Sequence, residues 1–201
     1  MKQRRLVVGP ETVRMLELGH PWVIADQYTR RWPPGKAGEV VELADERGRP
    51  LVTALLDPAD RVVARVLGRG TVRLDGAWLR ERLERAGVLR TRHAELEGTT
   101  AYRLVNGEGD GLSGLTVDRY GEHLMVQLYS GAWQPHLPLL TSALQERFAP
   151  RGIYEKLRPQ QTRTLASGEG KRYSRLLAGT AAPVRLPVEE NGLTFLVELE
   201  T

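Results

Sequence analysis

The stretch from residue 102 to residue 129 constrains the fold more than any other part of the chain. Two runs rich in apolar, β-branched and aromatic residues, 115–120 and 124–129, flank a turn at Gly121. This pattern predicts a β-hairpin, because such residues suit a half-buried pleated surface. A shorter run at 102–105 predicts a third strand just before them.

The loop between residue 105 and this hairpin carries Gly109, Gly111 and Gly114, which have the letters of the dinucleotide-binding fingerprint. That fingerprint needs a helix straight after its last glycine, because phosphate binding uses the free N–H groups of a helix N-terminus. A strand is expected here instead. We therefore interpret the loop as structural, with glycines that supply positive φ. Asp110 and Asp118 are expected to cap the loop and a strand end rather than to form a catalytic pair.

Helical periodicity appears on both sides of these strands. Apolar residues between 78 and 89 recur at helical spacing and predict an amphipathic helix that runs to about residue 96. A second such pattern spans 135–148 and ends before Pro150, and a strand is expected at 153–156. Strands and helices together predict an α+β unit with the helices against a small sheet.

The first 72 residues have a different pattern. A helix is expected at 10–18, and short strands are expected near residues 1–8, 22–24, 40–43, 51–56 and 61–67. Five short strands and one helix predict a small, mostly-β barrel.

The C-terminal segment holds Asn191-Gly192 between two apolar runs, which is a strong signal for a hairpin turn. We therefore expect an α+β fold class in three parts. They are a small barrel domain at 1–72, an α+β middle domain at 73–187 and a β-hairpin at 188–201.

Composition excludes several classes of site. The chain has no cysteine, which excludes disulfides and thiolate metal ligands and is compatible with the cytoplasm. Its four histidines lie in separate segments, so no metal site is expected. No apolar run approaches the roughly 18 residues of a membrane span, so no membrane partner is expected. Of the 29 basic residues only four are lysines. Arginine suits phosphate recognition, although a GC-rich genome would have the same effect.

Residues 102–120 read Tyr-Arg-Leu-Val-Asn-Gly-Glu-Gly-Asp-Gly-Leu-x-Gly-Leu-x-Val-Asp-Arg-Tyr. This run resembles the signature of the middle domain of a bacterial family of SAM-dependent rRNA methyltransferases, which make 5-methylcytosine in 23S rRNA. The family order is a PUA domain, this middle domain and a Rossmann-like catalytic domain. Ser113 stands where members often carry proline. The resemblance covers the whole chain but only the first two domains, so a Rossmann-like catalytic domain is absent from these residues.

The first domain resembles a PUA domain in its order of strand, helix, Gly-His-Pro-Trp and a closing Arg-Val-Val-Ala-Arg-Val strand. PUA domains bind structured RNA, largely through shape and backbone. The resemblance places the RNA face around the helix, the following turn and the final strand. Pro159 to Gly170 is expected to be a basic loop that either embraces RNA or simply connects. The candidate RNA-binding residues are Lys2, Arg4, Arg5, Arg14, Gly19, His20, Trp22, Arg61, Arg65, Lys156, Arg158, Arg163, Lys171 and Arg172.

Trp22 has two interpretations, and core packing is favoured over base stacking because aromatic residues in small barrels usually fill them. His20 has no neighbouring residues of the kind that bind a metal.

Methylation of cytosine C5 requires a nucleophile to add at C6, usually a thiolate, and this chain has none. It also lacks a strand–glycine loop–helix pattern for SAM. We therefore expect neither catalytic nor cofactor-binding residues here, with S-adenosylmethionine bound by a longer enzyme. The favoured hypothesis is the RNA-substrate-binding portion of an rRNA (cytosine-C5) methyltransferase, cut before its catalytic domain. The alternatives are a stand-alone PUA-type RNA-binding protein and, least favoured, a small-molecule enzyme using the glycine loop. The expected partner is RNA, 23S rRNA by resemblance, and a homodimer stays open.

Overall fold

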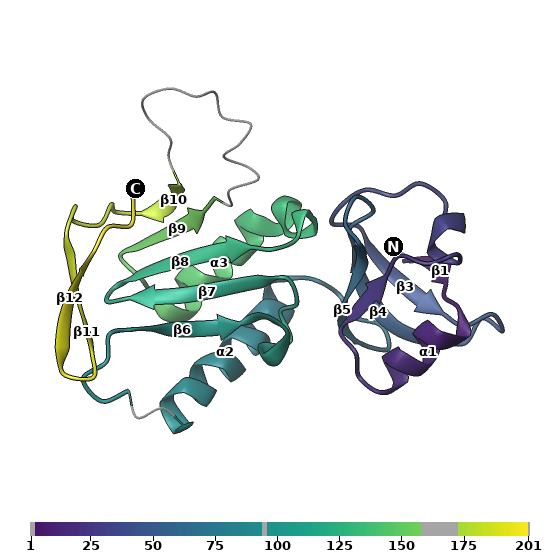
Figure 1. The fold of residues 1–201 in the computed structure, drawn as a ribbon, viewed down its shortest axis with the longest axis horizontal. Helices are drawn as coiled ribbons and strands as arrows, with labels where there is room; N and C mark the ends of the chain where they lie inside the picture. Colours follow the sequence, from purple (N-terminus) through teal and green to yellow (C-terminus); the bar gives the residue numbers. More distant parts are fainter. Residues whose placement is uncertain (1–2, 94–95, 158–172, 201) are drawn as a thin grey trace.

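The computed structural model describes residues 3–93, 96–157 and 173–200. Two five-stranded sheets lie side by side, the first purple to blue and the second teal to yellow in Figure 1. The first sheet has the order β1-β3-β4-β5-β2, so β1 and β2 are its two edges. Its strands are β1 Arg4–Val7, β2 Trp22–Ile24, β3 Val40–Ala44, β4 Pro50–Leu56 and β5 Val62–Arg69.

One helix, α1 (Pro10–Glu17), packs against this sheet through Leu16, which is buried with the strands' inward side chains. Pro10 occupies its first turn, where a missing N–H costs nothing. Gly19 follows the helix with a φ of +90°, a conformation that glycine adopts freely. A short 3₁₀ helix, η1 (Thr29–Arg31), follows β2. The five strands and the helix expected in this region are present, and closure into a barrel remains a prediction.

The second sheet has the order β10-β9-β8-β7-β6. Only β8 and β9 pair in parallel, and the other neighbours are antiparallel. A parallel pair needs a long crossover, which η3 and α3 supply between β8 and β9. The elements of this part are α2 Gly76–His93, β6 Ala101–Asn106, η2 Gly107–Asp110, β7 Leu115–Tyr120, β8 His123–Leu128, η3 Gly131–His136, α3 Leu137–Phe148, β9 Gly152–Lys156 and β10 Ser174–Gly179.

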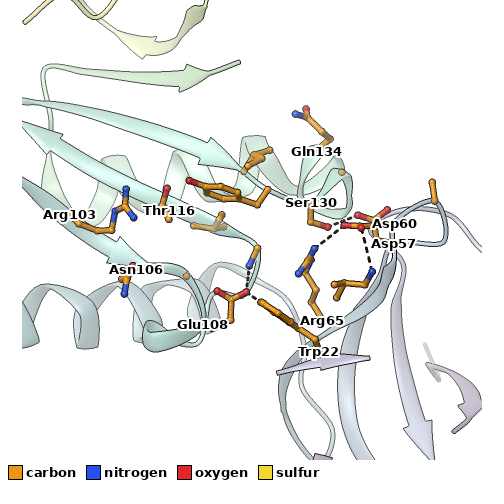
Figure 2. A pocket seen from close by; sticks show the side chains of 18 residues that line it. Trp22, Asp57, Asp60, Arg65, Arg103, Asn106, Glu108, Thr116, Ser130 and Gln134 are labelled. Atoms are coloured by element: carbon orange, nitrogen blue, oxygen red, sulfur yellow. Dashed lines mark hydrogen bonds and ion pairs between the residues drawn. The ribbon is translucent and has the colours of Figure 1, made fainter. Parts of the chain in front are cut away.

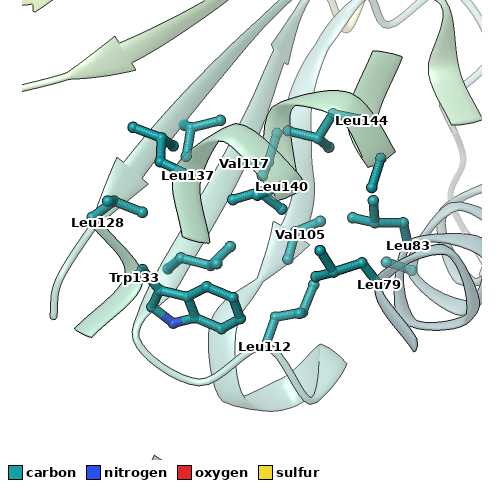
Figure 3. Packing of buried hydrophobic residues seen from close by; sticks show 14 of the residues in the cluster. Leu79, Leu83, Val105, Leu112, Val117, Leu128, Trp133, Leu137, Leu140 and Leu144 are labelled. Carbon is teal, nitrogen blue, oxygen red and sulfur yellow. The ribbon is translucent and has the colours of Figure 1, made fainter. Parts of the chain in front are cut away.

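Both helices cover one face of the second sheet, and Figure 3 shows the apolar core between them. Trp133 belongs to this core and is fully buried, and its indole N–H donates to the Ser113 carbonyl at 2.8 Å, so the ring's polar atom is satisfied. The other residues of this core share complete or near-complete burial, and they include Leu79, Leu83, Val105, Leu112, Val117, Leu128, Leu137, Leu140 and Leu144.

The opposite face is covered by the hairpin of β11 (Leu186–Glu190) and β12 (Leu193–Val197). Val188 packs with Met125 and Tyr154, so β8 and β9 are buried on both faces. The turn at Asn191-Gly192 has positive φ at both residues, which confirms the hairpin expected from this dipeptide.

The glycine loop is structural, as expected. Gly111 and Gly114 have φ values of +71° and +87°, and the strand β7 follows directly, so the dinucleotide fingerprint is a false match. Asp110 caps the loop, because its carboxylate accepts from the Asn106 N–H at 2.6 Å and pairs with Arg90.

Two elements differ from expectation. The strand β10 carries no recognisable pattern in the sequence, because only Ser174 of its six residues is fully buried. Leu89 falls at the helical spacing of the apolar residues in α2, yet its side chain is 44% exposed. The loop expected at Pro159 to Gly170 lies outside the described residues.

Candidate functional site

Two leucines of the first sheet join the apolar core of the second sheet. Leu55 on β4 and Leu67 on β5 belong to the first sheet, yet both are buried in the cluster built around the second sheet. Polar contacts reinforce this junction. Ser130 Oγ donates to Asp57 Oδ2 at 2.5 Å, and His136 Nε2 donates to the Gly38 carbonyl at 2.7 Å. The two sheets are therefore joined by buried contacts as well as by the chain.

A cavity of about 780 Å³ lies at this junction, and Figure 2 shows side chains from both sheets facing it. Its first wall comes from β2, β5 and the β4–β5 loop, and its second from β6, η2, β7 and the segment after β8. The residues that line it with polar or aromatic groups are Trp22, Asp57, Asp60, Arg65, Arg103, Asn106, Glu108, Thr116, Tyr129, Ser130 and Gln134.

Glu108 connects the two walls. Its Oε1 accepts hydrogen bonds from the Trp22 indole at 2.8 Å, from Ser113 Oγ at 2.9 Å and from the Gly114 N–H at 3.1 Å. Partial burial on its own would raise the pKa of Glu108, but these donors outweigh it and hold that pKa below its usual value. The carboxylate therefore stays charged where it faces the cavity.

Arg65 forms part of the same wall and is only 5% exposed. Its Nη2 donates to Asp60 Oδ2 at 2.9 Å, and its stem lies against Gly114. A Cβ at Gly114 would be 2.8 Å from the Arg65 Cδ, so only glycine allows this approach. Arg65 is thus a buried, neutralised cation of the junction rather than a free cation on the surface.

The favoured interpretation of Trp22, that it packs in a core, was wrong. It is 37% exposed and lies on the cavity wall rather than in the core. The reason is the alternation of β2, where Val23 points inward and the two flanking residues point outward. His20 is beside it, with its ring 5.8 Å away in an edge-on arrangement, and Gly19 ends the preceding helix.

The other predicted RNA-binding residues are spread over the molecule. Arg61 is exposed between the cavity-lining residues Asp60 and Val62. Arg14 is exposed and pairs with Glu11.

Arg4 and Arg5 lie on β1, the edge strand opposite β2, and pair with Glu39 and Glu42. Lys156 is exposed at the end of β9. The remaining candidates, Lys2, Arg158, Arg163, Lys171 and Arg172, lie outside the described residues.

The cavity's second wall was missed by the sequence reasoning. Asn106 and Glu108 stand in the glycine-rich signature, so a signal for them existed, but it was interpreted as loop structure alone. Thr116 and Gln134 sit among residues of ordinary strand and helix patterns, and only the fold brings them to the cavity.

The glycine loop and the second sheet do not fit SAM. The glycine loop leads into a strand, and the second sheet pairs in parallel at β8–β9 alone, so it lacks the strand–loop–helix crevice of a dinucleotide-type site. Among the described residues no group of three or more His, Cys, Asp or Glu could hold a metal, and no helix is long and apolar enough to cross a membrane.

Comparison with known proteins shows what this chain is similar to. Residues 6–69 match the family model of a PUA-like domain. Ribosomal RNA large subunit methyltransferase I from Cronobacter sakazakii is 33% identical over 201 residues, which cover 98% of this chain and 49% of that protein. This chain is similar to about one half of that methyltransferase. The same enzyme from Escherichia coli O139:H28 is 32% identical with equal coverage. The chain thus spans about half the length of these curated relatives.

Solved structures agree in fold. A protein described as a SAM-dependent methyltransferase from Streptococcus mutans superposes with a TM-score of 0.82 at 25% identity, over 98% of this chain and 49% of that one. A second structure, of a methyltransferase complexed with SAH, has the same TM-score at 24% identity and supports the fold alone.

The Gly114 contact gives a stability prediction. Gly114→Ala and Gly121→Ala both place a side chain at positive φ, but a Cβ meets nothing within 4 Å at Gly121 and collides with Arg65 at Gly114. We expect Gly114→Ala to lower the free energy of unfolding by about 1–3 kcal/mol more than Gly121→Ala, measured by urea denaturation. Equal losses in the two variants would contradict a close Gly114–Arg65 packing.

The Glu108 carboxylate gives a pH prediction. Because its pKa is lowered in the folded protein, its stabilising contribution is present above the ordinary value near 4.5 and is lost as pH falls through the lowered value. Wild type should therefore exceed Glu108→Gln in stability at pH 7, and this difference should shrink at pH 3. Glu190→Gln, which removes one exposed charge from the hairpin, is the matched control. A difference that stays constant with pH would refute the charged hydrogen-bonded Glu108.

Proposed function

We propose that this chain is the RNA-substrate-binding portion of a class I SAM-dependent methyltransferase that modifies C5 of cytosine in 23S rRNA. The observation that carries the proposal is the similarity to ribosomal RNA large subunit methyltransferase I over 98% of the chain. The PUA-like match at residues 6–69 supports RNA as the substrate. The parts that act in this role are the PUA-like domain at 1–72, the α+β middle domain at 73–187 and the hairpin that begins at 188.

Charge supports an RNA partner. Residues 1–72 carry 12 basic and 9 acidic side chains, and residues 122–187 carry 9 and 4. Several arginines of the PUA-like domain are exposed, and Arg61 has no ion pair among the described residues. Exposed, unneutralised cations are the groups that contact phosphate and release counterions.

The chemistry of methyl transfer is assigned to residues outside this chain. Cytosine C5 methylation by the usual route requires a thiolate, and the sequence contains no cysteine. We infer that a Rossmann-like domain of the longer enzyme supplies both that thiolate and the SAM site. The role of these 201 residues is to bind the rRNA and present the target base. A cytoplasmic enzyme, monomeric or homodimeric, fits this role.

The alternative is a stand-alone PUA-type protein that binds RNA without modifying it. It rests on the same PUA-like match and the same exposed arginines. Both functions require RNA binding, and only the first requires methyl transfer, so two measurements separate them.

The first measurement tests RNA binding. Arg61→Glu should weaken the affinity for a structured 23S rRNA fragment roughly five- to tenfold and flatten its salt dependence, because one phosphate contact is lost. Fluorescence anisotropy at several salt concentrations measures both quantities. Arg92→Glu is the control, since it reverses an exposed arginine on α2 that lies outside both basic segments. The joint reversal of Arg61 and Arg65 is a poorer test, because Arg65 is buried and its loss would disturb the junction. An unchanged affinity of Arg61→Glu for the RNA would contradict the assignment of the PUA-like face as the RNA-binding surface.

The second measurement tests methylation. The polypeptide isolated from its source cells is incubated with labelled SAM and protein-free 23S rRNA, and the product nucleosides are separated. Labelled 5-methylcytidine is expected from that polypeptide and none from the 201 residues alone. RNA binding without any methylated product would favour the stand-alone binding protein.

A further inference from the structure

The cavity between the two sheets is not used by the function proposed above, which needs only an RNA-binding surface. We propose that this cavity binds one unpaired RNA nucleobase that carries an exocyclic amino group, stacked on the indole of Trp22. The inference rests on the proposed function in one respect, namely that the chain binds RNA.

Trp22 has the properties of a stacking platform. More than a third of the side chain is exposed, which leaves apolar ring surface open to the cavity. The ring cannot rotate freely, because its N–H is held by Glu108 across the junction and its neighbour His20 contacts it edge-on. A ring fixed in orientation loses little entropy when a base stacks on it, and base–aromatic stacking is a main source of affinity for single strands.

The charge of the cavity excludes phosphate as the group it accepts. Asp57, Asp60 and Glu108 are its carboxylates. Its two guanidinium groups are already neutralised, Arg65 by Asp60 at 2.9 Å and Arg103 by Asp118 at 2.8 Å. A cavity with this balance repels anions and favours hydrogen-bond donors.

Glu108 offers the acceptor for such a donor. The hydrogen bonds from Trp22, Ser113 and Gly114 all fall on Oε1, so none of these three groups uses the lone pairs of Oε2. A carboxylate is a good acceptor for the exocyclic amine of cytosine, and adenine and guanine carry similar amines. Uracil has a carbonyl where cytosine has this amine. Its carbonyl oxygen would face the Glu108 carboxylate, and two acceptors cannot form a hydrogen bond.

Polar atoms without hydrogen-bond partners on the same walls indicate that a ligand binds in the cavity. Thr116 is 7% exposed, and its hydroxyl has no partner among the residues that the structure describes. The Arg65 Nε is buried and likewise unpartnered in that part of the chain. Both residues line the cavity, and Figure 2 shows Thr116 and Asn106 on the wall that adjoins Glu108. Buried polar groups are nearly always hydrogen-bonded, so two orphans on one cavity indicate that the protein alone does not complete it.

The RNA strand that carries the base can lie along the mouth of the cavity. Arg61 is exposed and lies between two cavity-lining residues, Asp60 and Val62. The backbone phosphates of the flanking nucleotides can therefore meet a cation outside while the base enters an acceptor-rich interior.

The test uses the full chain and nine-nucleotide oligomers of cytidine, adenosine or uridine, each carrying fluorescein and titrated by anisotropy. Wild type should bind the cytidine and adenosine oligomers more tightly than the uridine oligomer. Trp22→Ala should weaken the cytidine oligomer about tenfold without changing the salt slope, because stacking is lost and no phosphate contact changes. Trp22→Phe should stay within about threefold of wild type, since it keeps an aromatic face. Phe195→Ala, which removes a similarly exposed ring from the hairpin, should bind like wild type.

Glu108→Gln tests base selection separately from stacking. Its side chain keeps an acceptor for Trp22 but replaces Oε2 with an amide donor, so the preference for cytidine over uridine should disappear or reverse. An undiminished preference in this variant would overturn the role of Glu108.

A measurement on the wild-type chain alone does not depend on whether a variant folds. Ultraviolet cross-linking of the wild-type chain to the cytidine oligomer, followed by trypsin, should label the peptide 15–30, which contains Trp22. Labelling confined to other peptides, or wild-type affinity in a folded Trp22→Ala, would overturn the nucleobase site while RNA binding itself stands. A wild-type chain that binds neither these oligomers nor structured rRNA would instead refute the proposed function.

Discussion

The burial of two leucines from the first sheet in the core of the second is the contact on which the rest of the structure depends. Leu55 and Leu67 leave water only when the sheets are in place. Burial of two such side chains contributes on the order of 3–6 kcal/mol, which is comparable with the whole net stability of many domains. The cavity, the Trp22–Glu108 bond and the buried Arg65 all exist because this apolar contact sets the spacing of the sheets. The junction therefore acts as part of the fold and as part of a candidate binding site.

The polar groups at the junction show how charged side chains are accommodated where the two sheets meet. Arg65 is accommodated because Asp60 neutralises it and Gly114 leaves room for its stem. Glu108 is accommodated because three donors converge on one oxygen. Each arrangement needs residues that are far apart in the sequence, so the site is a property of the assembled sheets rather than of either one. This explains why the PUA-like match alone does not describe the cavity.

Much of the fold could be predicted from the sequence. The alternation around Gly121, the helical spacing before residue 89 and the Asn191-Gly192 turn are local signals, and the elements they predict are present. The site was harder to predict. Trp22 was assigned to a core because a single strand pattern does not show which face meets a second sheet. Arg65 was expected on an RNA-binding face, yet its cross-strand position beside Trp22 places it in the junction. Gln134 and Thr116 had no sequence signal, because their proximity to Trp22 arises only from tertiary packing.

The hairpin at the end of the described chain has a consequence for the order of folding. It covers Met125 and Tyr154, and Glu189 exchanges hydrogen bonds with Thr100, which lies 89 positions earlier. During synthesis the helices can cover their face of the second sheet as soon as β9 has emerged from the ribosome. The opposite face stays open to water until the last strands arrive, so the nascent protein carries an exposed apolar sheet for the time needed to add some 40 residues. Chaperone contacts at that stage would therefore fall on Met125 and Tyr154, two residues that are buried once the hairpin has packed against the sheet.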